Sequence, residues 1–85
     1  MKTDNTYNGW TNYATWRINL ELLDGMELND WPQDVQGLSD ALKAYVEDYI
    51  DLSCEDGFAK DYALAFISDV NWYEIADHKL AEVAA

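Results

Sequence analysis

Residues 35–52, VQGLSDALKAYVEDYIDL, carry the clearest periodicity in the chain. Apolar side chains recur there at alternating steps of three and four residues, the spacing of one face of an α-helix. These side chains are Val35, Leu38, Leu42, Tyr45, Tyr49 and Leu52. The pattern predicts a helix of about five turns that buries this face. We expect Pro32 in its first turn, a weak point at Gly37 that divides off a short leading turn, and an end near residue 55, before Gly57.

Three further helices are predicted around this long one. The first spans about residues 12–24, with Thr11 or Asn12 as its cap and Asp24-Gly25 as its stop. Another spans about residues 58–69. The side chains that these two helices are expected to bury are Tyr13, Trp16, Ile18, Leu20, Leu22 and Leu23 in the first, and Ala59, Tyr62, Ala63, Phe66 and Val70 in the other.

The last helix is predicted from the chemistry at its start. Asn71 is the expected N-cap, Glu74 stands where it closes a capping box, and Val70 and Ile75 hold the positions of a hydrophobic staple. Its expected buried side chains are Trp72, Ile75, Ala76, Leu80 and Val83. No segment alternates like a strand. We therefore predict an all-α fold: one acidic domain over residues 1–85, a compact bundle of about four helices with one long central helix. Residues 1–11 form an extended lead-in that packs Tyr7 and Trp10 on the core.

Charge limits the possible partners. The 85 residues include 17 acidic and 5 basic side chains, a net charge of −12, yet 49% of the chain is hydrophobic and 14% aromatic. Such a composition indicates a folded acidic domain, because disordered acidic segments contain few aromatic residues. Nucleic acids and anionic membranes are excluded as direct partners, since phosphate contacts require Lys or Arg. A basic groove on another protein is the favoured partner.

The acidic residues are concentrated on the predicted long helix and in the connector before it. Residues 20–60 contain 11 acids and two lysines, Lys43 and Lys60. An ordinary solvated face, the alternative interpretation, usually mixes both signs of charge. Five of these acids fall within about 100° of arc opposite the apolar face and span roughly 22 Å. With three connector residues, the candidate partner-binding residues are Asp40, Glu47, Asp48, Asp51, Glu55, Glu27, Asp30 and Trp31.

Metal binding and catalysis find little support in the sequence. Asp24, Glu27 and Asp30 lack the ligand alternation and the sixth-position glycine of an EF-hand loop. One cysteine and one histidine do not make a zinc site. His78 has no facing carboxylate, and Cys54 is surrounded by acids that disfavour its thiolate. We expect no enzyme activity, no cofactor and no metal. A single cysteine and the absence of an apolar leader or membrane span are typical of a soluble cytoplasmic protein.

Two motifs suggest a biological context. Residues 7–25, YNGWTNYATWRINLELLDG, include an Asn-Tyr-x-Thr-Trp signature, and residues 70–77 read VNWYEIAD. The pair resembles a group of small acidic proteins of phages, plasmids and integrated elements. This resemblance covers about a third of the chain. It implies a mobile genetic element and a bacterial host cytoplasm, and it brings no site residues.

Charge and context together lead to a functional hypothesis. We expect a non-enzymatic counter-defence protein, similar to anti-CRISPR or antirestriction inhibitors, whose acidic surface occupies the nucleic-acid-binding site of a host defence complex. The alternative is a phage or plasmid accessory adaptor that binds a protein through an aromatic or apolar patch, for which Trp31 and Tyr73 are the expected exposed aromatics. Salt separates the two hypotheses, because only the first predicts binding that weakens steeply with ionic strength. A small enzyme or metal-dependent regulator is the remaining alternative, and the oligomeric state stays open.

Overall fold

The computed structural model describes residues 9–84, which form four α-helices and one π-helical segment and contain no strand. The elements are α1 (Tyr13–Ile18), η1 (Asn19–Leu23), α2 (Val35–Ser53), α3 (Phe58–Ile67) and α4 (Trp72–Ala84). The fold is all-α, as predicted. Most of the predicted lead-in, including Tyr7, lies outside the described residues; residues 9–11 are not helical, and Trp10 is half-buried against the core.

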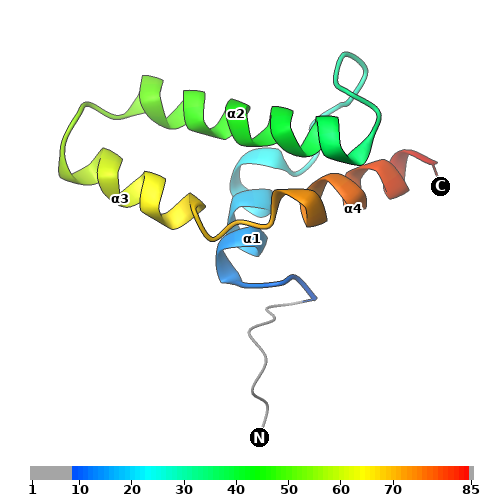
Figure 1. Cartoon of the computed structure of the whole chain (residues 1–85), viewed down its shortest axis with the longest axis horizontal. Helices are drawn as coiled ribbons and strands as arrows, with labels where there is room; N and C mark the ends of the chain where they lie inside the picture. The colour runs from blue at the N-terminus through cyan, green and yellow to red at the C-terminus, as the bar shows by residue number, and fades with distance from the viewer. Residues whose placement is uncertain (1–8, 85) are drawn as a thin grey trace, which may run out of the picture.

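α2 is the longest element, and the other helices are arranged around it. Figure 1 shows α3 and α4 following one another along one side of α2 and running back against its direction, while α1 and η1 cross between them. α2 packs most extensively against α4 and less against α3. The core lies where these elements meet, and its largest fully buried aliphatic side chains are Leu23, Leu38, Leu42, Val46 and Ile75. None of the helices in residues 9–84 is long and apolar enough to span a membrane.

The start of α2 differs from the prediction. Its N-cap is Asp34, whose carboxylate accepts the Gly37 backbone N–H at 2.7 Å. Pro32 therefore precedes the helix and is not in its first turn. Gly37 does not divide the helix either, because α2 runs unbroken from Val35 to Ser53. A Cβ at position 37 would lie only 2.8 Å from Asp34 Oδ1, so glycine leaves room for the capping carboxylate. α2 ends at Ser53, two residues before the expected end.

The buried face of α2 is also different from the one predicted. Leu38, Leu42, Val46 and Ile50, spaced four residues apart, are buried, whereas Tyr45, Tyr49 and Leu52 are exposed. On a helical projection this rotates the core-facing side by roughly 60°. The physical reason is polarity: a buried tyrosine hydroxyl needs a hydrogen-bond partner, and an aliphatic side chain needs none.

α1 begins as expected, but its buried side is narrower. Asn12 is the N-cap, and its Oδ1 accepts the Thr15 backbone N–H at 2.9 Å. The expectation that Tyr13 and Leu20 are core residues is wrong, because both are exposed. A π-helical turn contains one more residue than an α-helical turn. Leu23, five residues after Ile18, can therefore share the buried side with Ile18. The side chains of Trp16 and Leu22 are half-buried.

The other two helices depart from their predicted faces in opposite ways. α3 buries only Ile67; Ala63 is half-buried, whereas Ala59, Tyr62 and Phe66 are exposed, contrary to expectation. α4 follows its prediction more closely. Its buried or half-buried apolar side chains are Trp72, Ile75, Ala76 and Leu80, and only Val83 of the expected set is exposed.

A buried lysine on α4 contacts the C-terminal end of η1. The Lys79 ammonium donates to the backbone carbonyl of Leu23, the last residue of η1. This carbonyl also accepts the Met26 backbone N–H at 3.3 Å, and a cation at the end of a helix complements the helix dipole. Burial lowers the pKa of Lys79, since the charged amine is removed from water.

The two sequence motifs meet in a network of hydrogen bonds. Asn71 Oδ1 accepts the Glu74 N–H at 3.0 Å, which confirms the predicted N-cap of α4. The predicted capping box does not close, because Glu74 Oε1 accepts the Thr11 N–H at 2.9 Å and the Asn71 N–H donates to Thr15 Oγ1 at 2.9 Å. Asn12 Nδ2 also donates to the Asp69 carbonyl at 2.8 Å. We call this network the polar junction; it ties α1 to the start of α4.

Candidate binding surface

Four exposed carboxylates lie along α2. Asp40, Glu47, Asp48 and Asp51 are all exposed, although Asp51 is turned towards Lys60 of α3 and Glu47 towards the connection between α3 and α4. On a helical projection they cover about 100° of arc. We call these four residues the acidic face. It corresponds to the helical part of the surface predicted from the sequence.

Two of these carboxylates have partners within the chain. Asp51 accepts a hydrogen bond from the Lys60 ammonium, which also reaches Asp56 at 3.0 Å. These hydrogen bonds, the one to Asp51 foremost, raise the pKa of Lys60. Asp40 accepts from Gln36 Nε2 at 3.1 Å, a neutral contact that leaves its charge in place. Glu47 and Asp48 form no ion pair with any residue in 9–84. Most of the charge of this face is thus available to a partner.

The other predicted site residues lie apart from the acidic face. Glu55 was expected on the same helix, but it follows the end of α2, in the turn before α3. Glu27 and Asp30 are exposed in the connector at the opposite end of α2 (Figure 1). Trp31 is half-buried, with its ring edge-to-face against Tyr45 at 5.6 Å. Of the two aromatic residues expected to be exposed, Trp31 is therefore only partly so, whereas Tyr73 is exposed on α4.

Sequence reasoning missed an aromatic surface beside the acidic face. Tyr45, Tyr49 and Leu52, which the 3–4 spacing places in the core, are exposed on α2. Asp48 is three residues from Tyr45 and four from Leu52, so its carboxylate is a surface neighbour of both. The signal that could have revealed this was the purely aliphatic series 38, 42, 46 and 50, which competes with the tyrosine-containing series for the buried side.

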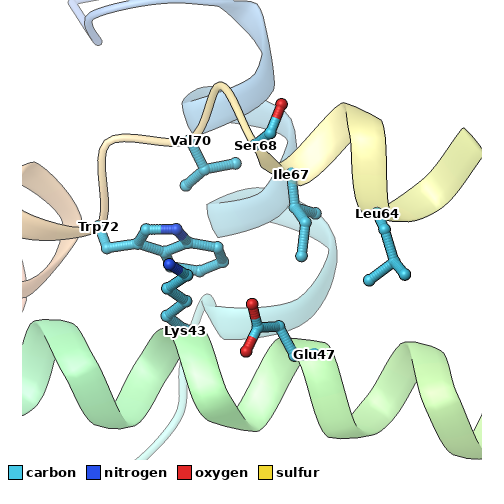
Figure 2. A pocket seen from close by; sticks show the side chains of 7 residues that line it. All are labelled: Lys43, Glu47, Leu64, Ile67, Ser68, Val70 and Trp72. Carbon is cyan, nitrogen blue, oxygen red and sulfur yellow. The ribbon is translucent and has the colours of Figure 1, made fainter. Parts of the chain in front are cut away.

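A groove borders the acidic face. It has a volume of about 550 Å³ and lies between α2 and the connection from α3 to α4. Figure 2 shows Lys43 and Glu47 pointing into it from α2, with the Lys43 side chain extending towards the indole of Trp72. Its lining residues are Lys43, Glu47, Leu64, Ile67, Ser68, Val70 and Trp72. One wall is therefore charged and the other largely apolar, and Glu47 belongs to both the groove and the acidic face.

A comparison with protein families identifies the family of the chain. A family model matches residues 3–85, which is almost its entire length. The chain belongs to DUF7249, a family of unknown function. No curated protein and no solved structure matches it. The DUF7249 match includes both halves of the polar junction as well as α2, so the junction and the acidic face lie within one family domain.

The remaining chemistry of this DUF7249 chain concerns isolated groups. Residues 9–84 contain no cluster of three or more His, Cys, Asp or Glu side chains suited to a metal ion, and Asp24, Glu27 and Asp30 do not gather into one. His78 packs against the Trp10 ring at 4.3 Å between centroids. Cys54 is half-buried at the end of α2. The arrangement best suited to a function is the exposed carboxylates on a rigid helix, which can bind a cationic surface.

Proposed function

We propose that this protein is a non-enzymatic inhibitor whose acidic face occupies the nucleic-acid-binding site of a basic protein complex. The observation that carries the proposal is the placement of Asp40, Glu47, Asp48 and Asp51 as four exposed carboxylates along one helix. A helix holds carboxylates at fixed spacing, so a partner that pairs with them orders few additional side chains. The net charge of −12 would also speed association with a cationic groove.

The spacing of the acidic face suits competition with a phosphate backbone. Asp40 and Asp51 are eleven residues apart, which corresponds to roughly 16 Å along an α-helix. One strand of duplex DNA carries a phosphate about every 3.4 Å of axis, so a comparable length presents about five charges. Four carboxylates over that distance approach the charge of a single strand, and the Lys or Arg side chains that hold phosphates could pair with them.

The proposed context is bacterial counter-defence. The Asn-Tyr-x-Thr-Trp and VNWYEIAD motifs resemble those of small acidic proteins from phages and plasmids, whose hosts protect themselves with nucleases. The proposed targets are restriction enzymes or RNA-guided surveillance complexes in the host cytoplasm. Both classes bind nucleic acid in basic channels.

A second candidate is favoured by one observation. Tyr45, Tyr49 and Leu52 are exposed next to the acidic face, and tyrosine is enriched in the energetic centres of protein interfaces. The chain could then be an accessory adaptor that binds mainly through this aromatic surface. Such binding would change little with salt, whereas binding through the acidic face weakens as salt screens the charges.

A cleavage assay tests the proposal. The purified chain is titrated into a panel of purified restriction enzymes and RNA-guided nucleases, each with its own DNA substrate. We expect stoichiometric inhibition of at least one nuclease, relieved by excess substrate and by raised salt. Inhibition unaffected by salt would favour the adaptor-like surface. Degradation or modification of the target by catalytic amounts of the chain would contradict a non-enzymatic role.

A further inference from the structure

The outer side of α3 presents a row of aromatic side chains. Phe58, Tyr62 and Phe66 are four residues apart, so they share one side of the helix. The Phe58 and Tyr62 rings meet edge to face at 4.8 Å, and Phe66 meets Tyr13 of α1 at 6.2 Å. The exposed fractions are 78% for Phe58, 65% for Tyr62, 37% for Phe66 and 40% for Tyr13. We call these four residues the aromatic row.

The charge around the aromatic row differs from the rest of the chain. α3 contains one cation, Lys60, and one anion, Asp61, so its net charge is zero, while the whole chain carries −12. Lys60 is moreover engaged with Asp51 and Asp56. A basic partner would find a single counter-charge on this helix, the carboxylate of Asp61. A second copy of the chain would be repelled at the acidic face, but it would meet a largely apolar surface here.

The size of the aromatic row fits a small interface between two copies. A fully exposed aromatic side chain offers roughly 150–250 Å², so the exposed fractions leave roughly 300–550 Å² of aromatic surface per chain. That is as large as the largest apolar patch of a typical monomer. Two such surfaces, with the exposed Ala59 and Ala65 beside them, come close to the ~1,200 Å² at which specific interfaces begin.

We propose that the aromatic row is a homodimer interface in which two α3 helices pack antiparallel about a two-fold axis. Tyr62 lies midway between Phe58 and Phe66, so an antiparallel pair places the two Tyr62 side chains near the axis and Phe58 of one chain near Phe66 of the other. The small side chains of Ala59 and Ala65 allow the helices to approach closely. The modest area makes this a weak dimer, with a Kd on the order of tens to hundreds of micromolar.

Analytical ultracentrifugation tests the dimer. The full chain is examined up to about 1 mM, at about 0.05 M and about 0.5 M sodium chloride. We expect a monomer–dimer equilibrium that strengthens with salt, because salt screens the repulsion between two chains of −12. This salt effect is opposite in sign to that expected for the acidic face, so failure of one proposal leaves the other standing.

Two double variants locate the interface. Phe58→Ser with Tyr62→Ser removes two exposed aromatics from the row and should raise the Kd at least about tenfold, which is 1.4 kcal/mol. Tyr49→Ser with Tyr73→Ser removes two exposed aromatics elsewhere and should leave the Kd unchanged. Circular dichroism checks that both fold. Three results would overturn the proposal: a chain that stays monomeric, a dimer that survives the first pair of substitutions, or a dimer lost equally in both variants. If the chain stays monomeric, the aromatic row would instead be a surface that binds a different protein.

Discussion

Thr15 and Asn71, which are 56 residues apart in the chain, are joined by a hydrogen bond in which the Asn71 backbone N–H donates to the Thr15 hydroxyl at 2.9 Å. The same hydroxyl donates to Asn12 Oδ1 at 2.7 Å, and Thr15 is fully buried. One side chain thus links the cap of α1 to the cap of α4. The start of α1 is thereby fixed to the start of α4.

Replacing Thr15 tests this link. Thr15→Val keeps the shape of the side chain but leaves the Asn71 N–H without its acceptor, and an unsatisfied buried donor costs about 1–3 kcal/mol. We expect the free energy of unfolding in urea to fall by that amount. Thr15→Ser retains the hydroxyl and serves as the control, with a smaller loss from the missing methyl group. If Thr15→Val were as stable as the wild type, the hydrogen bond would not support the fold.

A matched pair of leucine variants tests which side of α2 is buried. Leu42 is fully buried, whereas Leu52, which the sequence pattern also places in the core, is 87% exposed. We expect Leu42→Ala to lower the free energy of unfolding by about 2–5 kcal/mol, and Leu52→Ala to change it by less than about 0.5 kcal/mol. Equal losses in the two variants would show that the core-facing side lies where the 3–4 spacing predicts.

The sequence predicts the helices of this fold better than their buried faces. The caps at Asn12 and Asn71 were predictable because an asparagine before a helical pattern supplies an acceptor to its own backbone. The face of α2 was not, because Tyr49 and Ile50 belong to two apolar series that overlap on the same helix. The 3–4 spacing alone does not choose between them; the second series is buried because its aliphatic side chains need no hydrogen-bond partner.

The polar junction and the buried lysine lay beyond prediction for a related reason. Glu74 has the right spacing for a capping box, yet its carboxylate bonds Thr11, which the fold brings beside it. Lys79 directly follows two polar residues, Asp77 and His78, and its burial depends on the carbonyl of Leu23, 56 residues earlier. The acidic face, by contrast, was largely predictable, because charge on an exposed helix side follows from spacing alone. Glu55 was misplaced because α2 ends at Ser53.

Lys79 predicts a pH dependence of stability. Burial lowers its pKa below the ordinary 10.5, against smaller opposing effects of Glu82 and Asp24. Between the folded-state pKa and 10.5 the unfolded chain binds more protons, so this lysine makes the free energy of unfolding rise with pH across that window. In Lys79→Met the long side chain remains but nothing titrates. We expect the stability of the wild type relative to Lys79→Met to increase as the pH is raised from neutral towards 10.5.

The raised pKa of Lys60 does not disturb that comparison. Its contribution is present below 10.5, is lost only as the pH rises above that value, and is common to both proteins. A stability difference between wild type and Lys79→Met that is flat or declining over this range would mean that the Lys79 ammonium keeps its hydration in the folded chain.

The most direct measurement is the inhibition constant for the most strongly inhibited nuclease of the panel, determined for two variants that each remove four charges. In the first, the acidic face is neutralised through Asp40→Asn, Glu47→Gln, Asp48→Asn and Asp51→Asn. In the second, four exposed acids elsewhere are neutralised through Asp61→Asn, Asp69→Asn, Asp77→Asn and Glu82→Gln. We expect the first variant to weaken inhibition at least about tenfold, or 1.4 kcal/mol, and the second less than about threefold. Equal effects of the two variants, or full inhibition by the first, would contradict binding through the acidic face of α2.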